Sequence, residues 1–295
     1  MKKKNLFISV VLFVLVSVFI FFLISGIKKF NSKVCLLKKI CFDIELNAKH
    51  SGLDYSLYIE ELKIPSLRAF KNDDEKFPAA SLIKIPILAA SLEAVKEGKI
   101  SLSDEVIINK KDITGGSGEL KKKKLPLKLT FNELLEYMIS VSDNTATNKV
   151  ISLLGDDYLN LKFKNMGLTK TCLSRRMMDF RSRRKGRENY TAAKDIALIL
   201  ERIYYGKLID SKSSLLALDM LKKQKVNDRL PKYLPKGVVV AHKTGLEKGV
   251  VHDAGIVFGA ESDYIICVLV KNTPNYSRAK KFIAQTSLLA YNLLQ

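Results

Sequence analysis

The chain has 295 residues and a formal charge of +20 at pH 7, and 47% of its residues are hydrophobic. This balance excludes intrinsic disorder for most of the chain and allows one or two globular domains. The four cysteines are too few for a disulfide scaffold, and the three histidines are isolated from one another, so we expect no metal site and no cofactor. Only Cys35 and Cys41 lie close enough in sequence to suggest a local bridge, and the sequence leaves their state open.

The first recognisable element is an uncharged, almost wholly apolar run of 23 residues, 5–27, preceded by three lysines. About 20 apolar residues in a helix span the hydrocarbon core of a bilayer, whereas the apolar part of a cleavable signal peptide is shorter. We therefore predict a single-pass transmembrane anchor over 1–27, followed by a linker over 28–50 that can include a first helix. A long cleaved signal is the alternative. Lysines on both sides of the run leave its orientation undecided.

The globular part, 51–295, begins with a predicted strand at 55–60 and continues with a mainly helical region. The signals in that region are periodic apolar residues and N-terminal caps. They predict a helix at 81–99, a glycine-rich loop at 114–118, a helix opened by the capping box of Thr130 and Glu133, a helix after Asn144, and a helix capped by Thr191.

The last sixty residues change character. Runs rich in β-branched residues at 237–242, 250–258 and 263–271 are separated by short turns, and a terminal helix follows at 277–294. Short connections imply antiparallel neighbours. The predicted fold class is therefore α+β: an antiparallel sheet completed by both chain ends and flanked by helices, with an inserted all-helical lobe.

Basic residues gather at 121–124, which is four consecutive lysines, and at 175–187, which holds seven Lys and Arg residues. Nucleic-acid binding would need aromatic residues among these charges or a groove-reading helix, and neither is visible, so we expect no nucleic-acid partner. For a membrane-tethered domain, the expected partners of these charges are anionic lipid headgroups or wall polymers.

The pattern Ser-x-x-Lys occurs four times, so its context must separate the occurrences. Ser25 lies in the apolar run, Ser182 lies among the arginines, and Ser277 opens the terminal helix. Only Ser81 begins a buried helix of the globular part. Positions i and i+3 share a helix face, so Lys84 would hold its amine near the Ser81 hydroxyl and could act as its base once partly desolvated.

Two rarer triplets follow in the chain. Ser142-Asp143-Asn144 lies between two predicted helices, and Lys243-Thr244-Gly245 ends a predicted strand. Singly, each triplet could consist of helix caps, an exposed strand lysine and a turn glycine. All three motifs in this order are far less readily explained by chance, and together they are typical of serine enzymes that react with β-lactams.

With these motifs, residues 50–295 resemble the penicillin-recognising serine hydrolases, most closely the class A β-lactamase-like branch. The spacings of 61 residues from Ser81 to Ser142 and 101 residues from Ser142 to Lys243 are similar to those of that branch. The resemblance implies an acyl-transfer site between a helical lobe and an antiparallel sheet, in a β-lactamase/transpeptidase-like fold.

By this resemblance, Ser81 attacks the substrate carbonyl and Lys84 assists its deprotonation. Ser142 relays a proton to the leaving nitrogen. The backbone N–H groups of Ser81 and Leu246 form an oxyanion hole.

The resemblance also implies a substrate-binding set. Asn144 positions the substrate, while Lys243 and Thr244 hold its carboxylate. Gly245 has no side chain and lets the substrate lie against the strand.

One family feature is absent. A hydrolytic class A enzyme has a Glu-x-x-Leu-Asn segment whose glutamate activates the water that breaks the acyl-enzyme, and the corresponding stretch, 174–191, lacks it. Aligning Arg176 with the arginine that opens the family's loop places Met178 near the glutamate position, and Met cannot act as a base. Asp179 is adjacent and Glu188 lies further along. Asp179 either assists deacylation or pairs with its arginine neighbours and holds the loop closed.

The resulting hypothesis is a membrane-tethered serine hydrolase with an extracytoplasmic catalytic domain, acylated on Ser81 by β-lactams, by peptidoglycan peptides, or by both. The alternatives are a D,D-peptidase or other penicillin-binding protein, a β-lactam sensor that is acylated once and held, and a basic surface-binding domain without chemistry. Cleavage of the N-terminal segment would make the protein secreted rather than membrane-bound.

Overall fold

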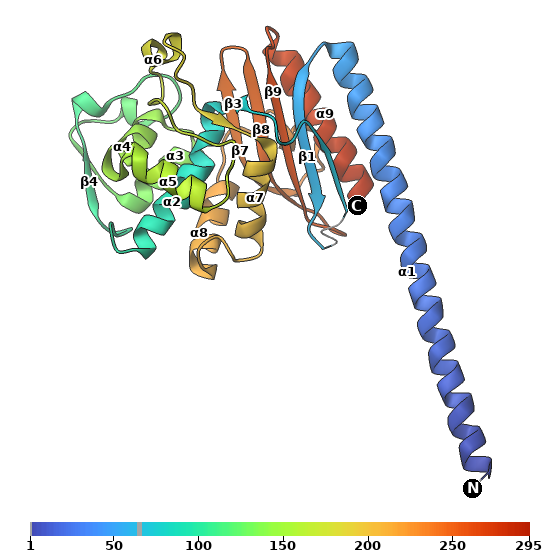
Figure 1. Ribbon diagram of the computed structural model, residues 1–295. Helices are drawn as coiled ribbons and strands as arrows, with labels where there is room; N and C mark the ends of the chain where they lie inside the picture. Colours follow the sequence, from blue (N-terminus) through green and yellow to red (C-terminus); the bar gives the residue numbers. More distant parts are fainter. Residues whose placement is uncertain (1, 64–66) are drawn as a thin grey trace.

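The computed structural model describes residues 2–63 and 67–295, without the side chains of 2–14, 29, 30 and 33. Its centre is an antiparallel sheet with the strand order β2-β1-β9-β8-β7 (Figure 1). The strands of this sheet are β1 (Asp54–Glu61), β2 (Arg68–Lys71), β7 (Val239–Glu247), β8 (Val250–Phe258) and β9 (Tyr264–Lys271). Two small ribbons pair β3 (Phe77–Pro78) with β6 (Tyr190–Thr191) and β4 (Glu105–Ile108) with β5 (Leu127–Thr130).

Helices cover both faces of the sheet. Those between β3 and β7 form a lobe on one side, and α1 and α9 lie on the other side (Figure 1). The α-helices are α1 (Lys2–Ser51), α2 (Lys84–Lys96), α3 (Phe131–Ser140), α4 (Asn144–Leu154), α5 (Asp156–Asn165), α6 (Phe180–Arg184), α7 (Ala193–Tyr204), α8 (Ser211–Lys222) and α9 (Tyr276–Leu294). Short 3-10 turns are η1 (Ala80–Ile83), η2 (Lys110–Asp112), η3 (Leu120–Lys122) and η4 (Leu230–Tyr233).

The two ends of the globular part meet in the sheet. The early strand β1 pairs along its whole length with β9, Asp54 opposite Lys271 and Glu61 opposite Tyr264. The prediction of an α+β fold with an antiparallel sheet completed by both chain ends is confirmed. The inserted lobe is mainly helical rather than all-helical, because the β4–β5 ribbon lies between α2 and α3. Because the lobe is inserted between paired strands, its motifs are held against the sheet edge at β7.

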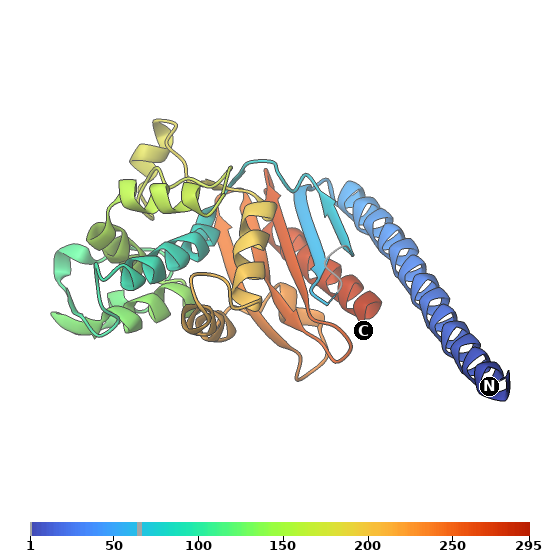
Figure 2. The same cartoon turned by 60° about the horizontal axis from the view of Figure 1, so that its bottom comes forward.

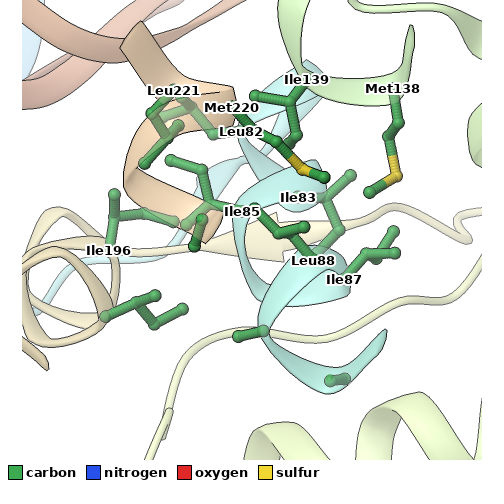
Figure 3. Packing of buried hydrophobic residues seen from close by; sticks show 14 of the residues in the cluster. Leu82, Ile83, Ile85, Ile87, Leu88, Met138, Ile139, Ile196, Met220 and Leu221 are labelled. Carbon is green, nitrogen blue, oxygen red and sulfur yellow. The ribbon is translucent and has the colours of Figure 1, made fainter. Parts of the chain in front are cut away.

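Two apolar cores lie on the two faces of the sheet. The larger one joins the helical lobe to the inner face, and α2 runs through it with ten of its residues buried, so that Ile85 and Leu88 pack among side chains of α3, α7 and α8 (Figure 3). The smaller core joins the other face to α1 and α9, where Tyr55 of β1 and Phe282 of α9 stack edge to face. A helix buried on all sides is a rigid support for catalytic groups at its N-terminus.

Helix α1 is continuous from Lys2 to Ser51 and extends far beyond the body of the molecule (Figures 1 and 2). Residues 28–50, predicted as a linker that can include a helix, are helical, and from Leu37 to Ala48 the apolar side chains of α1 pack on α9 and β2. The predicted anchor overlaps residues whose side chains lie outside the described part. Within the described residues, no helix has the length and apolarity that a membrane crossing requires.

The state of the two neighbouring cysteines follows from α1. Both Cys35 and Cys41 carry free thiols. They are six positions apart in the helix, a rise of about 9 Å at 1.5 Å per residue, which exceeds the roughly 7 Å limit between the Cα atoms of a disulfide. The local bridge that the sequence left open is therefore incompatible with this helix.

Two local predictions are wrong. Thr191 does not cap α7, because Ala192 occupies the N-cap position and the Thr191 hydroxyl instead bonds that of Thr171 at 2.9 Å. Strand β7 begins at Val239 and continues through Glu247, so most of the segment predicted as a turn after Lys243 is strand. The capping box of Thr130 and Glu133 is confirmed.

Candidate active site

The candidate nucleophile lies where the chain turns into the central helix. Ser81 is in η1, which leads directly into α2, and Lys84 is the first residue of that helix. The predicted single helix is thus preceded by a 3-10 turn. Ala80, just before Ser81, has a φ of +43°, a left-handed conformation that residues with a Cβ rarely adopt. This tight turn places Ser81, 8% exposed, at the wall of a cleft.

Lys84 connects the first motif to the second. Its amine is fully buried and donates to the Ser142 carbonyl oxygen at 2.7 Å, to Ser142 Oγ at 3.1 Å and to Asn144 Oδ1 at 2.9 Å. Burial, reinforced by the nearby charge of Lys243, lowers the pKa of Lys84 well below its usual 10.5. A lowered pKa favours the neutral amine, which is the form that can accept a proton.

The second motif is held by its central residue. The Asp143 carboxylate caps α4 by accepting from the backbone N–H of Ala146 at 2.9 Å, and it also accepts from those of Glu119 and Leu120 at 2.6 and 2.8 Å. Gly118 lies so close that a Cβ there would collide with this carboxylate. Sequence reasoning assigned Asp143 no role, although its place between two site residues was the available signal.

The flanking residues of that motif are oriented by this anchoring. Ser142 has a φ of +55°, which turns its hydroxyl and its carbonyl toward Lys84. Asn144 Nδ2 donates to the Gly115 carbonyl at 3.0 Å, which ties the motif to the glycine-rich loop. Of the predicted site residues, Lys84, Ser142 and Asn144 are therefore in direct contact, although 58 and 60 positions separate Lys84 from the other two.

The third motif lies on β7, which packs against η1. Lys243 is fully buried, and its amine donates to the Thr244 carbonyl at 3.0 Å. Burial lowers the pKa of Lys243 to about 7, against the opposing influence of Asp253, and the guanidinium of Arg229 lowers it further. Because the charge of Lys243 adds to burial in lowering the pKa of Lys84, the two amines of the site lie within electrostatic reach of one another.

Gly245 packs closely against the neighbouring strand β8. A Cβ built there would lie 3.1 Å from His252 Cδ2, which is tighter than ordinary van der Waals contact, and 3.5 Å from the carbonyl oxygen of Ala79, which is an ordinary contact. The missing side chain thus leaves room for the His252 ring beside β7, which is a physical reason distinct from the predicted room for substrate.

The buried groups behind β7 were missed by sequence reasoning. His242 Nδ1 pairs with Asp253 Oδ1 at 2.9 Å, and the other carboxylate oxygen accepts from the Leu230 backbone N–H at 3.0 Å. Arg229 is 1% exposed, and its charge lowers the pKa values of Lys243 and His252. No local sequence pattern marks these residues, because they meet only when the strand and the preceding turn pack together.

The cleft has a volume of about 330 Å³ and is lined by all three parts of the fold, namely η1, the helical lobe and the β7 edge. Its lining residues are Ala80, Ser81, Gly116, Ser117, Asn144, Arg175, Met177, Met178, Phe180, Leu246, Glu247, Lys248 and Tyr276. Ser81 and Leu246 thus share one cavity, as a common oxyanion hole requires.

The loop opposite the nucleophile presents methionines. Both Met177 and Met178 line the cleft. Asn148 fixes the backbone of Met177, accepting from its N–H at 2.8 Å and donating to its carbonyl at 3.1 Å. Met178 has a φ of +64° and lies beside Gly116. Neither methionine can accept a proton, so neither can supply the base whose position the resemblance placed near Met178.

Asp179 is placed as the cap of a helix. Its Oδ1 accepts from the backbone N–H of Ser182 at 2.9 Å, and its Oδ2 accepts from the Ser182 hydroxyl at 2.6 Å. These bonds to Ser182 are the main cause that lowers the pKa of Asp179. The side chain does not line the cleft, so the arrangement favours a role in loop structure, although through Ser182 rather than through the neighbouring arginines.

The arginine-rich segment turns two of its cations inward. Arg175 donates to both carboxylate oxygens of Glu247 at 2.7 and 2.9 Å and from Nε to Glu188 at 2.8 Å. Arg183 pairs with the same two carboxylates at 3.0 and 3.1 Å. This ionic clasp, defined as Arg175, Arg183, Glu188 and Glu247, joins the loop to the end of β7. Because Glu188 is bound by both arginines, it is not available as a base.

Comparisons with known proteins agree with this geometry. Residues 37–294 match a family described as the Beta-lactamase enzyme family. The extended-spectrum β-lactamase PER-1 of Pseudomonas aeruginosa is 28% identical over 238 residues, which cover 75% of this chain and 76% of PER-1.

Solved structures with similar folds include β-lactamases and a penicillin-binding protein. A β-lactamase from Sphaerobacter thermophilus is 30% identical with a TM-score of 0.77, covering 85% of this chain and 95% of that one. PBP-A is 32% identical with a TM-score of 0.77, covering 87% of this chain and 94% of that one. A Leu-to-Glu variant of PBP-A is known as an acyl-enzyme complex with penicillin G. The chain is therefore a serine enzyme that belongs to the β-lactamase family.

Proposed function

We propose that the protein is a penicillin-binding serine enzyme in which β-lactams acylate Ser81 and the acyl group leaves slowly. This proposal rests on which carboxylates line the cleft. Glu247 is the one carboxylate among its lining residues, and Arg175 and Arg183 both hold it. The groups for acylation are assembled, whereas a carboxylate free to activate water is not among the residues that line the cleft.

In the proposed acylation, neutral Lys84 takes the proton of the Ser81 hydroxyl as its oxygen attacks the lactam carbonyl. The developing oxyanion is held by the backbone N–H groups of Ser81 and Leu246. Ser142, bonded to Lys84, then passes a proton to the leaving lactam nitrogen as the C–N bond breaks. The product is a Ser81 ester with the opened ring attached.

Substrate binding uses the neighbouring side chains. Protonated Lys243 and the Thr244 hydroxyl hold the substrate carboxylate, supported by the positive charge of buried Arg229. Asn144, already in contact with Lys84, aligns the acyl amide. The physiological substrate that fits this apparatus is a peptidoglycan stem peptide, which a D,D-peptidase cleaves through the same acyl-enzyme. The similarity to PBP-A, a variant of which forms an acyl-enzyme with penicillin G, supports the acylation step.

A second candidate is β-lactam hydrolysis. It is favoured by the names of PER-1 and of the Sphaerobacter thermophilus protein, both of which are β-lactamases. It needs a water-activating group other than a cleft carboxylate. The lifetime of the acyl-enzyme therefore separates the two candidates.

We further propose that α1 tethers the protein to the cell membrane, with the catalytic domain outside the cytoplasm. The uncharged run of 23 residues at 5–27 supports this tether. So do the exposed apolar side chains between Leu15 and Ile27, which would be unfavourable in water. Membrane fractionation followed by alkaline extraction tests the tether: the protein should stay in the pellet, and release into the supernatant would contradict it.

The activity test uses the full chain in a mild detergent. After mixing with benzylpenicillin, intact-protein mass spectrometry should show one adduct, which peptide mapping assigns to Ser81. After removal of free drug, the adduct should persist for many minutes. Rapid return to the unmodified mass, with continuous release of opened penicillin, would support β-lactam hydrolysis instead. Release of D-alanine from a D-Ala-D-Ala peptide would distinguish a peptidase from a sensor.

A further inference from the structure

The cleft is bordered by two cations that the proposed chemistry does not use. Lys248 lines it and is exposed at the β7–β8 turn. On the helical-lobe side, the amine of exposed Lys121 donates to the carbonyl of Gly116, another lining residue. The cationic rim, defined as Lys121 and Lys248, therefore draws on two segments that lie far apart in the chain.

The rim has no ion-pair partner in the part of the chain that the structure describes. Glu247, next to Lys248 in sequence, and Glu188 are engaged in the ionic clasp with Arg175 and Arg183. Among the described residues, no ion pair involves Lys121 or Lys248. A cleft with low-dielectric walls and charges of one sign concentrates the field toward its opening.

The floor beneath the rim is apolar. Met177, Met178, Phe180 and Leu246 all line the cleft, and the last three are more than a third exposed. Such a surface fits an aromatic or aliphatic group and gives it contact area. The cavity thus combines an apolar floor with a positive edge.

The part of the substrate that reaches this cavity follows from the proposed function. The lining includes Ser81 and Asn144 but neither Lys243 nor Thr244. If Lys243 and Thr244 hold the substrate carboxylate and Ser81 attacks the carbonyl, the cavity lies on the other side of Ser81. The acyl side chain is then the group that enters it.

We propose that this cleft selects substrates that carry a second negative charge, a carboxylate on the acyl side of the scissile bond, in addition to the one held by Lys243 and Thr244. The inference rests on the proposed function. In a β-lactam this group is a carboxylated side chain, and in a wall peptide it is an acidic residue on the amino side of the cleaved bond. The apolar floor binds the rest of that group, and Lys121 and Lys248 bind the charge.

Three penicillins that differ only at the side-chain α-carbon test the proposal. Benzylpenicillin carries hydrogen there, carbenicillin a carboxylate and ampicillin an ammonium group. The second-order rate constant for acylation of Ser81 is measured on the full chain in detergent by intact mass. Carbenicillin should react about five to ten times faster than benzylpenicillin, and ampicillin more slowly than either, because charges at the rim raise or lower the local substrate concentration.

The carbenicillin preference is the ratio of the acylation rate constant for carbenicillin to that for benzylpenicillin. The variants K121Q and K248Q, singly and together, should bring this ratio closer to one, and 0.5 M salt should do the same. The matched control is K236Q, which removes one exposed positive charge near the opposite end of β7 and should leave the preference unchanged. Equal rates for the three penicillins in the wild type, or a preference that survives in the double variant, would overturn the inference alone. Absence of an adduct with all three would overturn the proposed function itself.

Discussion

The two walls of the cleft differ in how their polar groups are used. On the nucleophile wall, which carries Ser81, Lys84 contacts two residues of the second motif. Burial lowers the pKa values of Lys84 and Lys243 there. On the facing loop, called the loop wall below, Arg175, Arg183 and Glu188 are paired in the ionic clasp with Glu247 of β7.

This difference separates the two halves of a hydrolytic cycle. Lysines with lowered pKa values are reactive groups, because they give up a proton more readily than an ordinary lysine does. Carboxylates bound to arginines offer their oxygens to those partners rather than to water. The cleft is therefore organised for forming an acyl-enzyme, and the predictions below test each wall in turn, from the larger expected effect to the smaller.

The largest effect should come from the nucleophile wall. S81A should abolish the penicillin adduct, and K84M should slow its formation by about 10³-fold, because a positioned base contributes about 10² to 10⁴ in rate. Time courses of intact mass measure both. K96M, the same substitution in the last turn of α2, where Lys96 pairs with Asp210, should acylate like wild type. If K84M reacted at the wild-type rate, another group would be the base and the contrast between the walls would fail.

The facing loop should gain function when a base is supplied. M177E should shorten the acyl-enzyme half-life by about 10- to 100-fold, because Asn148 fixes the backbone of Met177 on both sides and so positions the new carboxylate. M178E is the matched variant, with the same chemistry on a more exposed residue, and its effect should be smaller. Unchanged half-lives in both variants would show that a missing base is not what slows deacylation.

The two walls also differ in how much of each could be predicted from the sequence. The three motifs on the nucleophile wall are local strings, and their order predicted that segments far apart in the chain lie together around Ser81. In the structure Lys84 contacts Ser142 and Asn144, and β7 packs against η1. The 3-10 turn at Ser81 was missed, because composition does not distinguish it from the first turn of a helix.

For the loop wall, the sequence could predict only that the family's glutamate is absent. The sequence showed that the glutamate was missing and that arginines were abundant, which suggested a basic surface for anionic lipid headgroups or wall polymers. It could not show that Arg175 and Arg183 turn inward, because their partner Glu247 is more than sixty positions away on β7. A run of charged residues shows how many charges a segment carries, whereas the partner of each charge depends on tertiary contacts.

The pH dependence of acylation sharpens the description of the nucleophile wall. The pKa of Lys243 is lowered to about 7, so its positive charge is present below pH 7 and is lost as the pH rises through that value. Acylation by benzylpenicillin should therefore fall by about tenfold between pH 7 and pH 8.5, because binding of the substrate carboxylate needs the charge. In K243R the guanidinium stays charged, and this decline should disappear. A decline of the same size in K243R would assign the titration to another group.

The smallest effect should come from Asp179. As the cap of α6 it accepts two bonds from Ser182, and these lower its pKa. D179A should therefore leave the acyl-enzyme half-life within twofold of wild type while lowering the thermal midpoint slightly at pH 7. Because the lowered pKa means that the ionised form is stabilised by folding, the difference in midpoint should shrink as the pH falls below about 4, where the unfolded-state carboxyl becomes protonated, and through the still lower folded-state pKa. A half-life lengthened tenfold or more in D179A would instead make Asp179 the deacylating base, and the loop wall would then be catalytic despite its paired charges.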